Sequence, residues 1–176
     1  MKKIITALLL MISLDALAQN NSYSVSTDEK NGSQVFNGPV TFNDLDKEAS
    51  FTWLKSGNEA YNPKEKRISF LDEHLKKYSM VIFLGTWCAD SKALIPKLEK
   101  VLEVTKYPKS QITMYGVDRD KNTKGGEEKK YDISFVPTII LLDNGKEIGR
   151  ITETVTKSVE TDLERMINKY EKTTAK

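Results

Sequence analysis

Residues 80–96 read MVIFLGTWCADSKALIP and pass from a continuous apolar run through a short turn into a helical pattern. The run Met80–Leu84 is typical of a strand that is buried on both faces of a sheet. A helix is predicted from about Cys88 to Thr105, and Pro96 inside it should kink it. Its apolar residues recur at helical spacing, at Leu94, Leu98, Val101 and Leu102. This strand, turn and helix place Cys88 at or next to a helix N-cap.

Elements of alternating type surround this unit. Further strands are predicted at Ile112–Val117, Thr138–Leu142 and Lys146–Glu153, and Asn144-Gly145 is a strong hairpin signal between the last two. One more helix follows Pro63, with Ile68, Leu71 and Leu75 on one face, and another ends the chain, marked by Val159, Leu163, Met166, Ile167 and Tyr170. Strands and helices that alternate along the chain, followed by a β-hairpin, predict a mixed sheet with helices on both faces.

The N-terminal fifty residues differ from the rest. Residues 1–18 have a Lys-led start, an apolar stretch too short to span a bilayer and the small-residue ending Ala16-Leu17-Ala18. These are the parts of a secretory signal peptide, cleaved after Ala18, although a buried N-terminal helix is the alternative. Residues 19–50 are polar and are expected to form a poorly ordered arm with a short strand near Val35 or Val40.

The packed domain is expected to span residues 51–176, with a turn at Ser56-Gly57-Asn58. The signal predicts a periplasmic or secreted protein, and export predicts no membrane contact once the signal is removed. If the route is eukaryotic, Asn20 and Asn31 are glycosylation acceptors.

Composition narrows the possible functions. The 176 residues carry 27 Lys and Arg against 25 Asp and Glu, a net charge of +2, which argues against a nucleic-acid partner. One Cys and one His exclude a Cys/His zinc cluster and an intramolecular disulfide. No metal or cofactor is expected. An unpaired thiol in an exported chain is either buried and inert or kept for chemistry.

The position of Cys88 favours chemistry. Free backbone N–H groups and the positive end of the dipole at a helix N-terminus stabilise an anion such as a thiolate. Ser91 lies about one helical turn further on, where its hydroxyl is expected to hydrogen-bond the sulfur. Asp90 opposes a thiolate by its charge but suits the first turn of a helix, and the helix role is favoured. His74 is expected on a solvated helix face.

Residues 87–96, WCADSKALIP, resemble the active site of the thioredoxin superfamily, Trp-Cys-x-x-Cys-Lys-x-x-x-Pro. Residues 131–138, YDISFVPT, resemble the segment that holds the cis-proline of that family. The resemblance covers about residues 60–170. It implies a thioredoxin-like three-layer α/β/α sandwich around a central mixed β-sheet, with Pro137 as the cis-proline.

The departures from the family pattern bear on mechanism. Ser91 replaces the second cysteine, which in the family resolves the mixed disulfide. Ile82 replaces the buried acid of the family, so the proton acceptor for that step is missing as well. Asp132 and Phe135 stand where the family often has glycine.

The resemblance therefore implies a single-thiol oxidoreductase in which Cys88 attacks a disulfide and Ser91 supports the thiolate. Resolution would come from the substrate or from an external thiol reductant. The substrate is expected to be a protein or small molecule bearing a disulfide or thiol. The expected binding residues are Trp87, Phe135, Val136 and Pro137.

Two further hypotheses remain open. In the first, the fold is a redox-inactive module that binds a peptide or protein, and Cys88 is dispensable. In the second, two chains share an iron–sulfur cluster, which export disfavours. Two residues also have a purely structural alternative. Trp87 would then pack at the edge of the core, and Pro137 would be an ordinary turn proline.

Overall fold

The structure is a computed structural model that describes residues 22–174. The predicted signal segment and Ala18 lie outside the described residues. The strands are β1 (Ser24–Thr27), β2 (Gln34–Val40), β3 (Ser79–Leu84), β4 (Ile112–Gly116), β5 (Thr138–Asp143) and β6 (Lys146–Thr152). The α-helices are α1 (Phe42–Lys47), α2 (Thr52–Ala60), α3 (Glu65–His74), α4 (Ala89–Val104), α5 (Glu127–Lys130) and α6 (Val159–Thr174).

The strands form one mixed sheet in the order β1-β2-β4-β3-β5-β6. Only β3 and β4 are parallel, and every other neighbouring pair is antiparallel. The predicted mixed sheet with flanking helices is therefore confirmed. The hairpin between β5 and β6 turns at Asn144 and Gly145, which both have positive φ (48° and 83°), as a tight hairpin of this kind requires.

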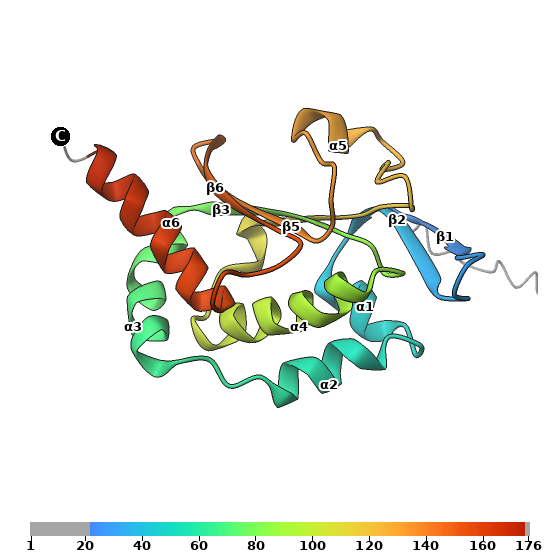
Figure 1. Cartoon of the computed structure of the whole chain (residues 1–176), viewed down its shortest axis with the longest axis horizontal. Helices are drawn as coiled ribbons and strands as arrows, with labels where there is room; N and C mark the ends of the chain where they lie inside the picture. The colour runs from blue at the N-terminus through green and yellow to red at the C-terminus, as the bar shows by residue number, and fades with distance from the viewer. Residues whose placement is uncertain (1–21, 175–176) are drawn as a thin grey trace, which may run out of the picture.

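The two faces of the sheet are covered unequally. Helices α2, α3 and α4 lie on one side of it and α5 on the other (Figure 1). The large core on the helical side joins Met80, Ile82 and Leu84 of β3 to apolar residues of α3, α4 and α6. The smaller core on the other side contains Val81 and Phe83. Because β3 is covered on both faces, its run of apolar residues has no polar alternation.

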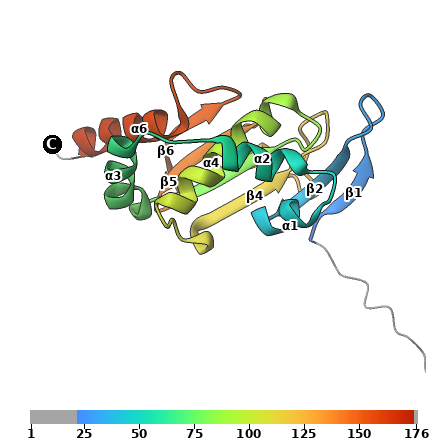
Figure 2. The same ribbon diagram turned by 90° about the horizontal axis from the view of Figure 1, so that it is seen from below.

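Residues 22–50 differ from the predicted poorly ordered arm, although the short strand expected near Val35 or Val40 is present as part of β2. They form the N-terminal hairpin (residues 22–40, that is β1, its connecting loop and β2) followed by helix α1. Strand β2 pairs with β4, and Val35, Phe36 and Val40 are buried. Figure 2 shows the hairpin at the end of the molecule where α4 begins. The polar residues suit β1, which faces solvent, while a few apolar residues of β2 suffice to anchor it.

The turn predicted at Ser56-Gly57-Asn58 is wrong, because these residues lie inside α2. A Cβ at Gly57 would lie 2.7 Å from Cβ of Pro96, so the glycine lets α2 approach α4 closely. The sequence pattern showed the glycine but not the neighbouring helix that requires it. Within residues 22–174, the helices are all too short or too polar to cross a membrane.

Candidate active site

Cys88 is the N-cap residue of α4, as the sequence predicts. Its backbone is extended (φ −87°, ψ 129°), and its side chain makes no capping hydrogen bond. The thiol is free and half-buried, and its Sγ donates to the carbonyl oxygen of Val136 at 3.4 Å. The sulfur thus stands at the positive end of a 16-residue helix, where a thiolate is favoured.

Ser91 is fully buried, and its position differs from the expectation. Its Oγ accepts a hydrogen bond from the backbone N–H of Gly85 at 3.1 Å. Among the described residues, no hydrogen bond joins this hydroxyl to the sulfur of Cys88. Ser91 therefore ties the end of β3 to the first turn of α4 and holds the turn that carries the cysteine.

The second predicted segment lies against the first. The Val136–Pro137 peptide bond is cis. Val136 and Pro137 are buried beside Cys88, whereas Phe135 is 52% exposed. The structure therefore brings Cys88, Val136 and Pro137 together and leaves one aromatic side chain in solvent on the same segment.

Trp87 is held on several sides. Its Nε1 donates to the carbonyl oxygen of Val117 at 2.9 Å, and the guanidinium of Arg119 lies 4.7 Å from its ring centroid. Its own carbonyl oxygen accepts from Nδ2 of Asn31 at 3.0 Å. A Cβ at Gly85 would meet the indole at 2.7 Å, so this position must stay without a side chain. Trp87 is thus a half-buried wall of the site with fixed orientation.

The N-terminal hairpin contributes residues that the sequence analysis missed. Oγ1 of Thr86 donates to the carbonyl oxygen of Gln34 at 2.6 Å and accepts from the N–H of Phe36 at 3.2 Å. Nζ of Lys92 donates to Oγ of Ser33 at 3.0 Å. No local signal marks these residues, because each contact joins positions at least fifty residues apart.

Asp28 and Arg119 form the ion pair of this region. The Arg119 Nε and Nη2 groups donate to the two carboxylate oxygens at 2.5 and 2.9 Å, and the backbone N–H groups of Lys30 and Asn31 donate to Oδ1 as well. The side chain of Asp28 is only 3% exposed. The guanidinium holds the pKa of Asp28 at about 2, and these backbone donors add to the effect.

The remaining candidates take ordinary structural places. Asp90 is exposed in the first turn of α4, where an acid suits the helix dipole. Ile82 is fully buried in β3. His74 is only partly exposed, which differs from the expected solvated face: it stacks on Phe70 and contacts Glu171 of α6 at 3.1 Å.

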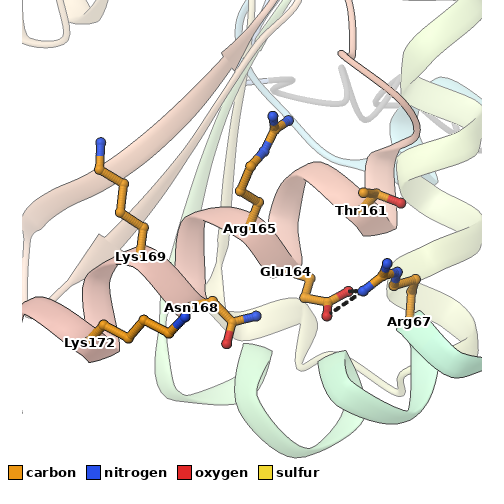
Figure 3. A pocket seen from close by; sticks show the side chains of 7 residues that line it. All are labelled: Arg67, Thr161, Glu164, Arg165, Asn168, Lys169 and Lys172. Atoms are coloured by element: carbon orange, nitrogen blue, oxygen red, sulfur yellow. Dashed lines mark hydrogen bonds and ion pairs between the residues drawn. The ribbon is translucent and has the colours of Figure 1, made fainter.

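A pocket of about 450 Å³ lies apart from Cys88, between α3 and α6 (Figure 3). Arg67 of α3 pairs there with Glu164 at 2.6 Å, and the other lining residues belong to α6. It contains none of the predicted site residues. A smaller pocket of about 140 Å³ adjoins the exposed start of α4 and includes Asp90, Ala93 and Val155. Cys88 and the other predicted site residues therefore lie around the start of α4 and not at the larger pocket.

The sequence of this chain is similar to that of known proteins. The family model described as Thioredoxin matches residues 64–169. The chain is 36% identical to thioredoxin-1 of Saccharomyces cerevisiae over 75 residues, which is 43% of this chain and 67% of the relative. It is 31% identical to a thioredoxin of Chlamydia pneumoniae over 91 residues, 52% of this chain and 80% of the relative.

A solved structure, mitochondrial thioredoxin 3 from Saccharomyces cerevisiae in its oxidized form, is similar at 21% identity with a TM-score of 0.37. The similarity covers 59% of this chain and 87% of that one. The segment that the family model matches includes Cys88 and Pro137 but not the N-terminal hairpin, which precedes residue 64.

Proposed function

Since this chain belongs to the thioredoxin family, we propose that it performs thiol–disulfide exchange with Cys88 as its reacting group. The observation that carries the proposal is the free, half-exposed thiol at the N-cap of α4, in contact with the Val136–Pro137 segment. A thiol at a helix N-terminus is poised to react as the thiolate, the form that attacks disulfides.

The first step is attack by the Cys88 thiolate on one sulfur of a substrate disulfide. The S–S bond of the substrate breaks as a new bond forms to Sγ of Cys88, and the other substrate sulfur leaves with the electron pair as a thiolate. The product is a mixed disulfide between this chain and the substrate. The N-terminal end of α4 stabilises the thiolate before the attack, and this stabilisation is lost as the negative charge moves to the leaving sulfur.

The second step needs a thiol from outside this chain. The sequence has one cysteine, so a second thiolate from the substrate or from an external thiol must attack the mixed disulfide and regenerate Cys88. If the substrate supplies it, the net reaction is disulfide isomerisation. If a small thiol supplies it, the net reaction is mixed-disulfide exchange. The protein itself returns to its starting oxidation state in both cases.

The residues around the sulfur take complementary roles in this proposal. Val136 and Pro137 align the substrate backbone, Phe135 gives an apolar contact, and Trp87 forms the adjacent wall. Ser91 keeps the turn in shape through Gly85 rather than through the sulfur. Its buried hydroxyl fills the place of a resolving thiol without providing its chemistry.

The signal-like residues 1–18 support a location outside the cytoplasm, in the periplasm or the secreted fraction. Export would bring the single thiol to a compartment where disulfides form and persist. The mass of the N-terminal peptide from fractionated cells tests this, and a mature chain that begins at Gln19 is expected.

Trapping the mixed disulfide tests the mechanism. The protein is incubated with an oxidised protein substrate without added thiol, and covalent adducts are followed by mass spectrometry. Wild type should accumulate an adduct through Cys88 that added glutathione releases, and Cys88→Ala should form none. Ser91→Cys is the matched variant, because it adds a resolving thiol at a buried position and should shorten the life of the adduct. Complete reduction of substrate by wild type without added thiol would exclude the single-thiol mechanism.

A redox-inactive binding module is the second candidate. The exposed Phe135 is the observation behind it, because a binding module would use this side chain for contact without any reaction at the thiol. The two candidates differ for Cys88→Ala. A binding module keeps its cellular function in this variant, whereas an exchange protein loses it.

A further inference from the structure

The loop of the N-terminal hairpin (residues 28–33) reaches the cysteine through Trp87. Asn31 donates to the carbonyl oxygen of Trp87 at 3.0 Å, one peptide unit before Cys88. Asp28 acts indirectly, because it holds Arg119, whose guanidinium covers the indole at 4.7 Å. The hairpin therefore restrains both the main chain and the ring of the residue that precedes the sulfur.

The loop is built to hold this shape. The carboxylate of Asp28 accepts from the backbone N–H groups of Lys30 and Asn31, and its backbone also bonds across the loop to Gly32 and Ser33. Gly32 has a φ of +71°, which a residue with a side chain adopts only at a cost. A nearly buried carboxylate is expensive without compensation, and here the guanidinium provides the compensating charge.

Arg119 is placed to act on the sulfur by its charge as well. The guanidinium lies over the ring of Trp87, the residue that precedes Cys88 in the chain, and its hydrogen bond to Asp28 raises the pKa of Arg119, so the group stays charged. Its side chain is about one-third exposed, so solvent does not fully screen it. Two charged residues follow Cys88 in the first turn of α4: Asp90 is exposed, and Nζ of Lys92 donates to Oγ of Ser33.

We propose that Arg119, clamped by Asp28 of the N-terminal hairpin, is a positioning residue of the Cys88 site that fixes Trp87 and stabilises the thiolate by its positive charge. The inference rests on the proposed thiol chemistry and deepens it. Asp28 and Asn31 lie outside residues 64–169, the segment that the family model matches. The N-terminal hairpin then belongs to the Cys88 site, because its residues position Arg119 and Trp87.

The test compares the pH dependence of Cys88 alkylation by iodoacetamide in wild type, Arg119→Gln, Asp28→Asn and Arg119→Lys. In Arg119→Gln, the carboxylate of Asp28 is left without its cation, so the profile should move to higher pH and the rate at pH 7 should fall about three- to tenfold. In Asp28→Asn, the guanidinium is left without its anion, so the profile should move to lower pH. If the Asp28–Arg119 pair only held the structure in place and had no effect through charge, both substitutions would move the pH profile in the same direction.

Arg119→Lys separates charge from geometry. Lysine keeps the charge but neither stacks as a plane nor makes the two-pronged pair, so the pH profile should stay near wild type while Trp87 loses its fixed environment. Near-ultraviolet circular dichroism, recorded in a Trp53→Phe background, reports the latter. Arg165→Gln is the matched control, since it breaks the Asp162–Arg165 ion pair on α6, and it should leave alkylation unchanged.

Shifts of equal sign in Arg119→Gln and Asp28→Asn, or no shift in Arg119→Gln, would overturn the inference. If Arg119→Gln does not fold, Asp28→Asn decides alone: a move to lower pH supports the charge role, and any other result overturns it. Alkylation needs no disulfide substrate, so a protein that shows these shifts but forms no mixed disulfide would refute the proposed function and leave the inference standing.

Discussion

Two segments meet at Cys88, the turn of residues 85–88 and the N-terminal hairpin, and different forces hold them. The turn is continuous with a buried strand and a 16-residue helix, so its shape follows from its neighbours in the chain. The hairpin is held by contacts to residues 50 to 91 positions away. Polar composition therefore does not indicate disorder here, because the polar groups of the hairpin are used in contacts with the site.

The largest expected effect separates the hairpin from the sheet. Gly116 of β4 lies opposite Gly38 of β2, and a Cβ at Gly116 would come within 2.0 Å of the carbonyl oxygen of Phe36. Because that atom is backbone inside a strand ladder, Gly116→Ala should lower the free energy of unfolding by at least about 4 kcal/mol, measured by urea denaturation.

Gly57→Ala is the matched comparison, because its Cβ would meet the Pro96 ring rather than backbone. The added methyl overpacks the α2–α4 contact, although alanine favours a helix over glycine, so a loss of about 1–3 kcal/mol is expected. A Gly116→Ala variant no less stable than Gly57→Ala would show that β2 does not dock as tightly as the structure has it.

The second prediction compares the two strands of the hairpin. Phe36 of β2 is 3% exposed and lies with its ring 4.5 Å from Tyr23 and 5.0 Å from Phe51. Phe36→Ala should cost about 3–5 kcal/mol of unfolding free energy, because it opens a cavity in the main core. Val25→Ala on β1, where half of the side chain is exposed, should change stability by less than about 0.5 kcal/mol. Equal losses would place the anchor of the hairpin elsewhere.

A smaller effect is expected where the two segments touch directly. Thr86 is fully buried and joins the turn to β2 by two hydrogen bonds, to Gln34 and Phe36. Thr86→Val keeps the shape but leaves both backbone groups without this partner, which should cost about 1–3 kcal/mol.

Thr113→Val is the control for Thr86→Val, since Thr113 is exposed on β4 and the substitution suits a strand. Urea denaturation of both variants gives the comparison. A neutral Thr86→Val would mean that the hairpin and the turn are only neighbours.

The sequence predicts the turn segment in full but the N-terminal hairpin only as a short strand near Val35 or Val40, for a physical reason. The run Met80–Leu84, the helical spacing after Cys88 and the Asn144-Gly145 turn are local patterns, and the structure has the elements they indicate. In β2 only Val35, Phe36 and Val40 are buried and apolar, and its partner β4 lies more than seventy residues further along the chain. A pattern within a short window carries no information about that pairing.

The same division applies within the site. Cys88 at the helix N-cap follows from the local pattern, whereas the contacts of Ser91 do not: its hydroxyl was expected at the sulfur and instead accepts from Gly85. Arg119 lies in the charged stretch of residues 118–121, where no local pattern marks it as part of a site. Its role depends on Asp28, 91 positions earlier, and no spacing rule links the two.

The final and smallest effect is a pH dependence of stability. Asp28 has a folded-state pKa of about 2, chiefly because of the hydrogen bond from Arg119, whereas an aspartate in an unfolded chain titrates near ~3.9. A lowered folded pKa stabilises the protein above the unfolded value, and this contribution is lost as the pH falls through about 2. The difference in unfolding free energy between wild type and Asp28→Asn should therefore be constant above about pH 5 and shrink between pH 4 and 2.

Asp72→Asn is the surface counterpart of this variant. Asp72 pairs with Lys76 one helical turn away, and that pair also lowers the pKa of Asp72. The side chain of Asp72 is 56% exposed and that of Lys76 is 36% exposed. Solvent screens such a pair, so the corresponding difference for Asp72→Asn should stay near zero from pH 7 to pH 2. If both variants give the same flat curve, the Asp28–Arg119 pair behaves as an ordinary surface ion pair. A difference that shrinks below pH 4 only for Asp28→Asn would instead show that the nearly buried ion pair contributes to stability. Because the folded-state pKa of Asp28 is about 2, the pair would then hold the hairpin loop against Trp87 down to strongly acidic pH.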